Sequence, residues 1–168
     1  MIAAALEPKI SFDHILSDYI GVVRKVCNLY ADSSEEYEDF YQECMLQIWK
    51  SHQNFRGEAK ASTWVYRVAL NVCLTQLKLK KRKVDNLSLD QKAERLAWEP
   101  YDTTRDEQVK TLYSAIRKLK ELDRAIIMLY LEEKSYDEIS EVMGLTMSNV
   151  GVRINRIKKQ LTQLINGR

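Results

Sequence analysis

Apolar residues in this chain recur at alternating steps of three and four over long stretches. Towards the C-terminus the stripe runs through Val150, Ile154, Ile157, Leu161 and Leu164. Towards the N-terminus another stripe runs through Phe12, Leu16, Tyr19, Val23, Val26 and Tyr30. Such spacing places one apolar face along an α-helix. Because the 168 residues include 5 glycines and 2 prolines, few breakers interrupt the pattern, and the sequence predicts an all-α fold.

The helical pattern is lost over residues 84–105. This stretch is polar, contains Pro100 and shows no sustained period, which is typical of a tether between domains. We therefore expect two small helical domains, residues 8–83 and 106–168, joined by a flexible linker at residues 84–105. The total length suits one medium domain or two small ones. The alternative is that residues 84–105 form an ordered crossover inside a single domain.

The N-terminal domain is expected to contain three helices that share one core. The second helix begins after Ser33, which together with Glu36 fits a capping box. Residues 51–60 are polar and include Gly57, so we expect a loop there. The third helix is expected over residues 62–81.

The C-terminal domain is expected to end in two helices separated by a very short turn. Ser135 and Glu138 fit a second capping box, at the start of a helix that Gly144 can close in a left-handed conformation. Thr146 can cap the helix that follows. Two helices joined by a turn that contains glycine predict a helix-turn-helix. The alternative is an ordinary helical hairpin with a solvated basic face.

The last predicted helix carries polar and basic residues opposite its apolar stripe. An α-helix fits the major groove of DNA, where its first turns face base edges and later basic residues approach phosphates. The predicted base readers are Ser148, Asn149, Val152 and Arg153, and the predicted phosphate contacts are Arg156, Lys158 and Lys159. Gly151 is unexpected inside a helix, where it costs about 1 kcal/mol relative to alanine. Close approach of the DNA backbone would explain it, and so would simple tolerance.

The net charge of +2 conceals two blocks of opposite sign. Residues 30–49 contain six acids and no bases: Asp32, Glu35, Glu36, Glu38, Asp39 and Glu43. Residues 59–84 contain seven bases and no acids, and Phe55, Trp64 and Tyr66 lie on or beside them. Aromatic rings can stack on unpaired bases while cations follow the phosphates, so this second block predicts binding of single-stranded DNA. The alternative for Trp64 is a place in the core.

Other functional classes find little support in the sequence. Cys27, Cys44 and Cys73 are odd in number and lack the spacing of a metal motif, so we expect reduced, buried residues of a cytoplasmic protein without metal or cofactor. His14 and His52 have no partners at ligand spacing, and no phosphate loop or nucleophile motif occurs, so we expect no enzyme. No apolar run approaches the roughly 20 residues of a membrane span.

Three stretches together resemble the extracytoplasmic-function (ECF) group of bacterial sigma factors: EYEDFYQECMLQIWK, FRGEAKASTWVYRVALNVCLTQLKLKKR and LDRAIIMLYLEEKSYDEISEVMGLTMSNVGVRINRIKKQL. Residues 12–83 are similar to region 2 of the family and residues 106–166 to its region 4. The combination of EDFYQE, the F-x-G loop, STW and ALN is the most specific part, since many regulators share a helix-turn-helix. The resemblance implies a non-catalytic subunit that binds core RNA polymerase and directs promoter recognition and transcription initiation.

The resemblance also implies roles for individual residues. Binding to the coiled coil of the polymerase β′ subunit carries over to Glu38, Asp39, Gln42, Glu43, Ile48 and Trp49. Melting and capture of the minus-10 promoter element carries over to Phe55, Ser62, Thr63, Trp64, Arg67 and Asn71, to which the basic block adds Lys78 and Lys81. Reading of the minus-35 element as duplex carries over to Asn149, Arg153 and Arg156, beside the predicted contacts Ser148, Val152 and Lys159.

Further partners follow from the resemblance alone. They are the flap of the polymerase β subunit, for region 4, and an anti-sigma factor that holds the sigma factor inactive. A second hypothesis is a stand-alone helix-turn-helix regulator that binds DNA as a dimer. Such a regulator would need a dimer seam and an effector or phosphoacceptor domain, and residues 1–105 show no such pattern.

Overall fold

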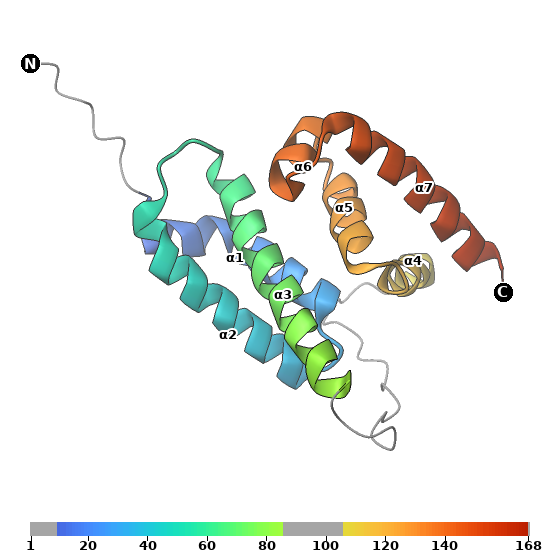
Figure 1. Ribbon diagram of the computed structural model, residues 1–168, viewed down its shortest axis with the longest axis horizontal. Coiled ribbons are helices and arrows are strands. Elements are labelled where there is room, and N and C mark those ends of the chain that lie inside the picture. The colour runs from blue at the N-terminus through green and yellow to red at the C-terminus, as the bar shows by residue number, and fades with distance from the viewer. Residues whose placement is uncertain (1–9, 86–105, 168) are drawn as a thin grey trace, which may run out of the picture. The chain divides into compact units, whose positions relative to one another are not determined.

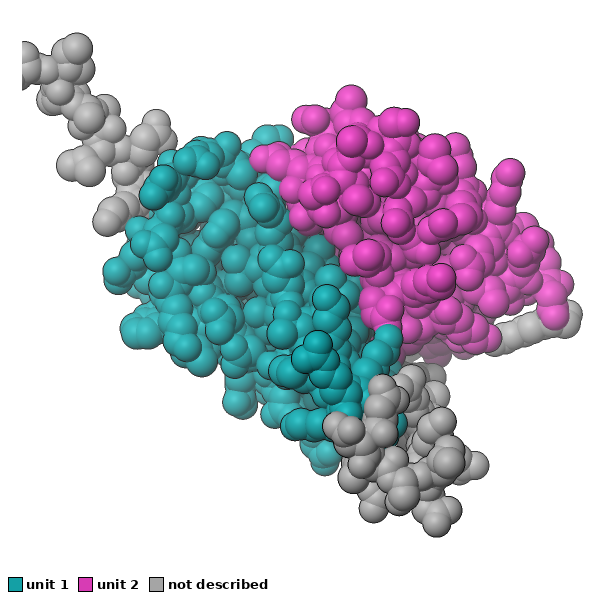
Figure 2. All heavy atoms as spheres, viewed as in Figure 1, with its two compact units in different colours: residues 1–93 teal, residues 94–168 magenta. Residues whose placement is uncertain are grey.

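Figure 1 shows the computed structural model of the chain, which describes residues 10–85 and 106–167. Within these residues the chain forms seven α-helices, one short 3₁₀ helix and no strand, which confirms the predicted all-α fold. The chain divides into two compact units, residues 1–93 and 94–168, which Figure 2 shows in different colours. None of the described helices combines the length and the apolar composition needed to cross a bilayer.

The first unit contains α1 (Phe12–Tyr30), α2 (Ser34–Ser51), the 3₁₀ helix η1 (His52–Asn54) and α3 (Ala61–Asp85). The three α-helices pack against one another in pairs. The third helix lies where the sequence predicted it, but α3 continues past residue 81 and enters the predicted linker. The rest of that linker, from residue 86, lies outside the described residues, so the boundaries of the two domains stay a prediction.

The core of the first unit takes one stripe from each helix. Its central members, each at most 4% exposed, are Val23, Val26, Cys27, Phe40, Cys44, Ile48, Val65, Ala69 and Cys73. The stripe of α1 differs at its start from the predicted one, because Ile15 is buried while Phe12 and Leu16 are half-buried. A helix in so small a body buries about one side. The outer sides of α2 and α3 are therefore left for other contacts.

An ionic cluster joins the start of α2 to α3. Ser33 caps α2 by accepting a hydrogen bond from the amide of Glu36 at 3.1 Å, as predicted. The carboxylate of Glu36, however, accepts from the amide of Asp32 at 2.6 Å and from the ammonium of Lys80 at 2.5 Å. Lys80 also lies 3.3 Å from the carboxylate of Asp32. The predicted capping box is therefore half formed, because Asp32 and Lys80 take the carboxylate that would have returned to Ser33.

The second unit contains α4 (Glu107–Arg117), α5 (Glu121–Leu131), α6 (Tyr136–Met143) and α7 (Met147–Asn166). α7 packs against the other three helices and buries the predicted stripe except at its end, where Leu164 is half-buried. Val150, Ile154 and Ile157 are fully buried, and Leu161 is 7% exposed. Burial of this stripe fixes the rotation of α7 about its axis and turns its opposite side to solvent.

The turn between α6 and α7 has the chemistry that the sequence predicted. The amide of Glu138 donates to Ser135 Oγ at 3.1 Å, and the amide of Ser135 donates to Glu138 Oε2 at 2.9 Å, so this capping box is complete. Gly144 closes α6 with φ 65° and ψ 34°, a conformation that costs glycine little. Thr146 accepts from the amide of Asn149 at 3.2 Å and caps α7. The helix-turn-helix of α6 and α7 is therefore confirmed.

Gly151 lies inside α7 next to the ring of Tyr136. A Cβ atom built on Gly151 would lie 3.4 Å and 3.8 Å from two carbons of that ring, which is ordinary van der Waals contact. The position therefore has room for alanine, and packing within the unit does not require glycine there.

Gly151→Ala is expected to raise the free energy of unfolding of the second unit by up to about 1 kcal/mol, because alanine favours the helix more than glycine does. Gly144→Ala is the matched control. It is expected to lower the free energy of unfolding by about 1–2 kcal/mol, because its backbone is left-handed. Urea unfolding followed by circular dichroism measures both changes. A clear loss of stability in Gly151→Ala would contradict the packing described above.

Candidate nucleic-acid interface

The exposed side of α7 carries all six residues that the sequence assigned to minus-35 DNA. Those six residues, here called the recognition face, are Ser148, Asn149, Val152, Arg153, Arg156 and Lys159. Val152 is 67% exposed, although it is apolar. The side chain of Arg153 is 27% exposed and that of Arg156 is 58% exposed. The structure thus places base-reading and phosphate-binding candidates together on one helix side.

Two arginines of the recognition face are tied to one buried carboxylate. Asp123, in the first turn of α5, is 3% exposed. Its Oδ1 accepts hydrogen bonds from Arg153 Nη1 at 3.0 Å and from Arg156 Nη2 at 3.1 Å, and its Oδ2 accepts from Arg156 Nη2 at 3.1 Å. Arg153 Nε also donates to Asn149 Oδ1 at 3.1 Å. A buried carboxylate is costly unless it is paired and hydrogen-bonded, so the arginines stabilise Asp123 while Asp123 fixes their direction.

The Asp123 network leaves positive charge on the recognition face. One carboxylate balances one of the two guanidinium groups. A guanidinium has five N–H donors, so Arg153 and Arg156 both keep donors that Asp123 and Asn149 do not use. Side chains that are already held in place lose less conformational entropy when they bind. The arrangement therefore suits a preorganised contact with base edges or phosphates.

Asp123 is the residue of this site that the sequence did not reveal. It precedes Arg153 by 30 residues and Arg156 by 33, and a side-chain contact at such a separation leaves no periodic signal. An acid in the first turn of a helix also has an ordinary explanation, because it interacts favourably with the helix dipole. The one hint in the sequence was that Asp123 lies in an apolar stretch, residues 122–131, where an unpaired charge would be costly.

The two neighbouring lysines of α7 have different surroundings. Lys158 Nζ donates to Tyr130 Oη at 2.7 Å and lies 4.3 Å from the centre of that ring. The hydrogen bond to Tyr130 raises the pKa of the Lys158 ammonium. Lys159 is exposed and makes no hydrogen bond or ion pair with the described part of the chain. Lys158, predicted as a phosphate contact, is thus held against α5, whereas Lys159 is available to a phosphate.

A second candidate face runs along α3. Its members, here called the α3 face, are Trp64, Arg67, Asn71, Lys78 and Lys81. They follow one another at steps of 3, 4, 7 and 3 residues, which places them on one side of a helix with about 3.6 residues per turn. Trp64 is half-buried and the other four are exposed. The structure therefore brings the predicted aromatic residue and the predicted cations together.

Phe55 packs against Trp64 at the start of the α3 face. The two ring centroids are 5.4 Å apart and the ring planes are inclined by 51°. Both side chains are half-buried, as is Ser62 in the first turn of α3. Trp64 is thus neither a core residue nor fully free, because one part of its ring packs on Phe55 while another part reaches solvent.

The outer side of α2 combines acids with exposed apolar side chains. Its exposed members, here called the α2 face, are Glu38, Asp39, Gln42, Leu46 and Trp49. Trp49 is 56% exposed and Leu46 is 42% exposed. Leu46 was not among the predicted residues. Its spacing of four from Gln42 and three from Trp49 is the signal that would have placed it on this face.

Two predicted contacts are corrected by the structure. Ile48 is 1% exposed and Thr63 is 3% exposed, so neither side chain presents itself to a partner. Successive residues of a helix point about 100° apart. Ile48 therefore lies in the core while its neighbour Trp49 faces outward, and Thr63 faces inward between Ser62 and Trp64.

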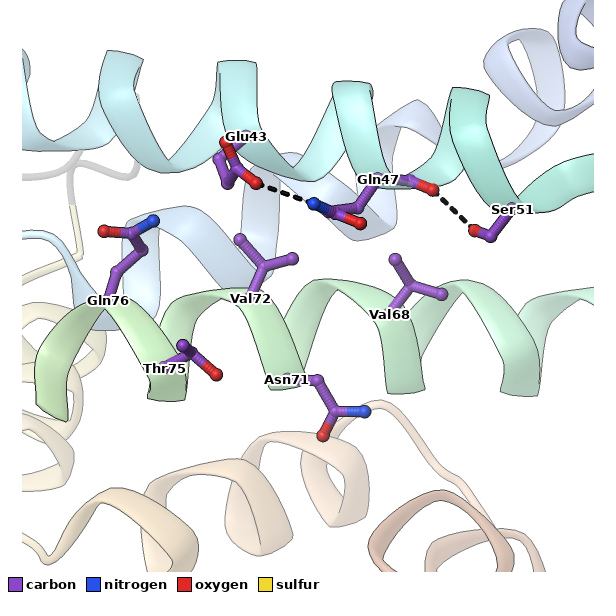
Figure 3. A pocket seen from close by; sticks show the side chains of 8 residues that line it. All are labelled: Glu43, Gln47, Ser51, Val68, Asn71, Val72, Thr75 and Gln76. Atoms are coloured by element: carbon purple, nitrogen blue, oxygen red, sulfur yellow. Dashed lines mark hydrogen bonds between the residues drawn. The ribbon is translucent and has the colours of Figure 1, made fainter. Parts of the chain in front are cut away.

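An open groove of about 320 Å³ lies between α2 and α3 (Figure 3). Its lining consists of Glu43, Gln47, Ser51, Val68, Asn71, Val72, Thr75 and Gln76. Val68 and Val72 point from α3 towards α2, and Glu43 accepts a hydrogen bond from Gln47 Nε2 at 2.8 Å. Because the lining includes an acid and no base, the groove is unsuited to a phosphate backbone. Glu43 faces this groove and is half-buried, and its contact with the polymerase stays a prediction.

Two family models match the two units. The model for Sigma-70 region 2 matches residues 15–83, and the model for Sigma-70, region 4 matches residues 110–161. The chain is 29% identical to the ECF RNA polymerase sigma-E factor of Haemophilus influenzae, over 94% of this chain and 88% of the relative. It is 27% identical to the ECF RNA polymerase sigma factor SigW of Bacillus subtilis, over 92% of this chain and 90% of the relative. This chain belongs to the sigma-70 family, in its ECF group of bacterial sigma factors.

A solved structure has a similar fold. It is the sigma factor RpoE of Bartonella quintana, in complex with the anti-sigma factor NepR. The TM-score is 0.75 at 18% sequence identity, and the match covers 92% of this chain and 96% of that chain. At this identity the similarity supports the fold, which is the helical fold that the sequence predicted.

Asp123→Asn tests the network behind the recognition face. The free energy of unfolding of the second unit is expected to fall by about 1–3 kcal/mol, because hydrogen bonds to a charged partner are lost. The recognition face also gains one positive charge and loses its fixed arginine geometry. Affinity for random duplex DNA should therefore rise at low salt, while the ratio of promoter to random affinity falls.

Fluorescence anisotropy with a promoter duplex and a scrambled duplex measures this ratio. Asp137→Asn is the matched control, since it removes an exposed acid from the first turn of α6 without touching either arginine. The control should raise affinity for both duplexes alike. An unchanged ratio in Asp123→Asn would show that Asp123 does not position the arginines.

Proposed function

We propose that this ECF sigma factor divides promoter recognition between its two units, the first binding core RNA polymerase and opened DNA and the second binding duplex DNA. The observation that carries the proposal is the separation of three exposed faces of different chemistry. The α2 face is acidic and apolar, the α3 face is aromatic and basic, and the recognition face is polar and basic. In this role the chain is a non-catalytic subunit that acts in the bacterial cytoplasm with the polymerase.

The α2 face is the proposed docking site for the coiled coil of the polymerase β′ subunit. Exposed apolar side chains that are surrounded by charged ones are typical of an interface with an apolar centre and a polar rim. Trp49 and Leu46 supply the apolar area, and tryptophan is the residue type most often found among energetic hot spots. Glu38 and Asp39 favour a basic partner and speed its association.

Trp49→Ala is expected to weaken binding to core RNA polymerase by about 2 kcal/mol, or roughly thirtyfold. Leu79→Ala is the matched control, because Leu79 is also an exposed apolar residue of the first unit, at 44%, and lies on α3 outside the two proposed faces. Titration of labelled core polymerase with each variant measures the affinity. Equal affinity of Trp49→Ala and wild type would contradict docking through the α2 face.

The α3 face is the proposed site for the opened minus-10 element. Extruding a base from a duplex costs a few kcal/mol, and stacking on an aromatic side chain returns about 1–3 kcal/mol per base. The Phe55–Trp64 pair offers a ring for stacking, while Arg67 and Lys78 offer cations to the backbone. The amide of Asn71 can bind the polar edge of an unpaired base.

The recognition face of α7 is the proposed reader of the minus-35 duplex. The second unit would also contact the flap of the polymerase β subunit, as the family does. Asn149 and Arg153 lie in the first two turns of α7, where a helix in the major groove meets base edges, and Lys159 lies further along. Base readers and phosphate contacts therefore predict different responses to mutation.

Arg153→Ala is expected to cost roughly 1–3 kcal/mol at particular base pairs and little elsewhere. Lys159→Ala should weaken binding to every sequence alike and reduce the slope of log affinity against log salt by about 1. Lys158→Ala is the matched control for charge, since Tyr130 holds Lys158, and it should leave the slope near the wild-type value. Duplexes with single base changes, titrated at several salt concentrations, separate these effects. A uniform loss for Arg153→Ala would count against base reading.

Control by an anti-sigma factor completes the proposal. It is supported by the family and by the similar fold of the RpoE that was solved with NepR. A protein that covered the α2 face would block polymerase, and one that covered the recognition face would block duplex DNA. Both faces are exposed in this chain, so both are open to such an inhibitor.

A further inference from the structure

Three thiols from three different helices meet in the core of the first unit. Cys27 belongs to α1, Cys44 to α2 and Cys73 to α3, and each is fully buried. Their sulfur atoms all lie within 4.8 Å of one another, and Cys27 Sγ is 3.8 Å from Cys44 Sγ. The sequence predicted buried cysteines but no cluster, because a motif along the chain cannot report ligands that tertiary packing brings together.

The separation of the sulfur atoms fits a shared ion. A metal bound to thiolates at about 2.3 Å with tetrahedral angles places its sulfurs about 3.8 Å apart. The observed distance between Cys27 Sγ and Cys44 Sγ has this value. A trivalent arsenic or antimony ion lies at the apex of a pyramid with angles below tetrahedral, so the three sulfurs, which lie within 4.8 Å of one another, would draw somewhat closer together around it. A disulfide would need two of the sulfurs to approach to about 2.0 Å and would leave the third without a role.

Charge selects among the ions that thiolates bind. Three thiolates carry three negative charges, and a net charge in an apolar core is very costly. A monovalent ion would leave two negative charges and a divalent ion would leave one. A trivalent ion leaves none. Val26, Val65 and Ala69, all buried in the same core, are consistent with a site that holds a neutral complex.

We infer that Cys27, Cys44 and Cys73 form a three-sulfur site for one trivalent thiophilic ion, of the class of arsenite and antimonite. The step needs no oxidant or reductant. Three S–H bonds and three As–O bonds of arsenous acid break, three As–S bonds form, and each thiol proton leaves with a hydroxyl group as water. The product is a neutral arsenic trithiolate.

The thiols are held next to one another in the core by contacts between the helices. Cys27 Sγ donates to Cys44 Sγ, and Cys44 Sγ donates to the carbonyl of Ala69, each at 3.8 Å. Each thiol loses its proton as its own As–S bond forms, so the core holds no net charge in the product.

Binding would cross-link α1, α2 and α3 at one point. Because a ligand that binds the folded state stabilises it, the first unit should unfold at a higher temperature when the ion is bound. The second unit contains no cysteine and should be unaffected. The α2 and α3 faces belong to the stabilised unit, so the site links the stability of the polymerase-binding unit to a thiophilic ion.

Native mass spectrometry of the full chain, reduced with a phosphine and treated with sodium arsenite, tests the site. The expected product has a mass gain of one arsenic atom minus three hydrogen atoms, at one ion per chain. Zinc chloride is the comparison for charge and should bind more weakly. No adduct, or an adduct that has lost two hydrogen atoms and kept a hydroxyl group, would overturn the three-sulfur site. A disulfide as the sole product would also overturn it.

Variants locate the site once the adduct is seen. Cys27→Ala, Cys44→Ala and Cys73→Ala should each abolish the trithiolate adduct and the rise in unfolding temperature of the first unit. Unfolding temperatures without arsenite show whether each variant folds. The mass of the wild-type adduct tests the site even if a variant fails to fold. An unfolding temperature of the first unit that still rises with arsenite as much as in the wild type, in any single variant, would contradict the inference.

Discussion

Burial of one apolar stripe per helix is the constraint on which the rest of this structure depends. The first unit uses it to pack three helices around Val26, Ile48 and Val65, and the second uses it to pack three helices against α7. The helix α5 is buried on nearly every side, with residues 125–129 at most 8% exposed, but α2, α3 and α7 each bury about one side. The same packing that stabilises each unit therefore leaves one side of α2, α3 and α7 exposed, and on these sides the residues that bind polymerase and DNA are proposed to lie.

Features that depend on neighbours along the chain could be predicted from the sequence. The stripe of α7, the capping box of Ser135 and the left-handed Gly144 were all predicted and are present. They depend on local hydrogen bonds and on the period of the helix, which a sequence displays directly. The recognition face follows from them, because a buried stripe determines which residues point outward.

Features that depend on contacts between helices could not be predicted in the same way. Asp123 reaches two arginines of α7, and Lys80 joins two acids at the start of α2. The acids of residues 30–49 therefore do not form one surface. Asp32 and Glu36 bind Lys80, whereas others, such as Glu38, face solvent. The inward rotation of Ile48 and Thr63 is likewise set by packing.

Photo-crosslinking in a complete complex of core polymerase, sigma factor and promoter DNA tests the division of labour most directly. A photoreactive side chain would replace Lys78 of α3 in one protein and Lys159 of α7 in another. The α3 position is expected to reach unpaired bases of the minus-10 element when polymerase is present, and the α7 position is expected to reach the paired minus-35 element. Crosslinks from both positions to one duplex segment, or from α7 of two chains to paired half-sites, would contradict this division of labour.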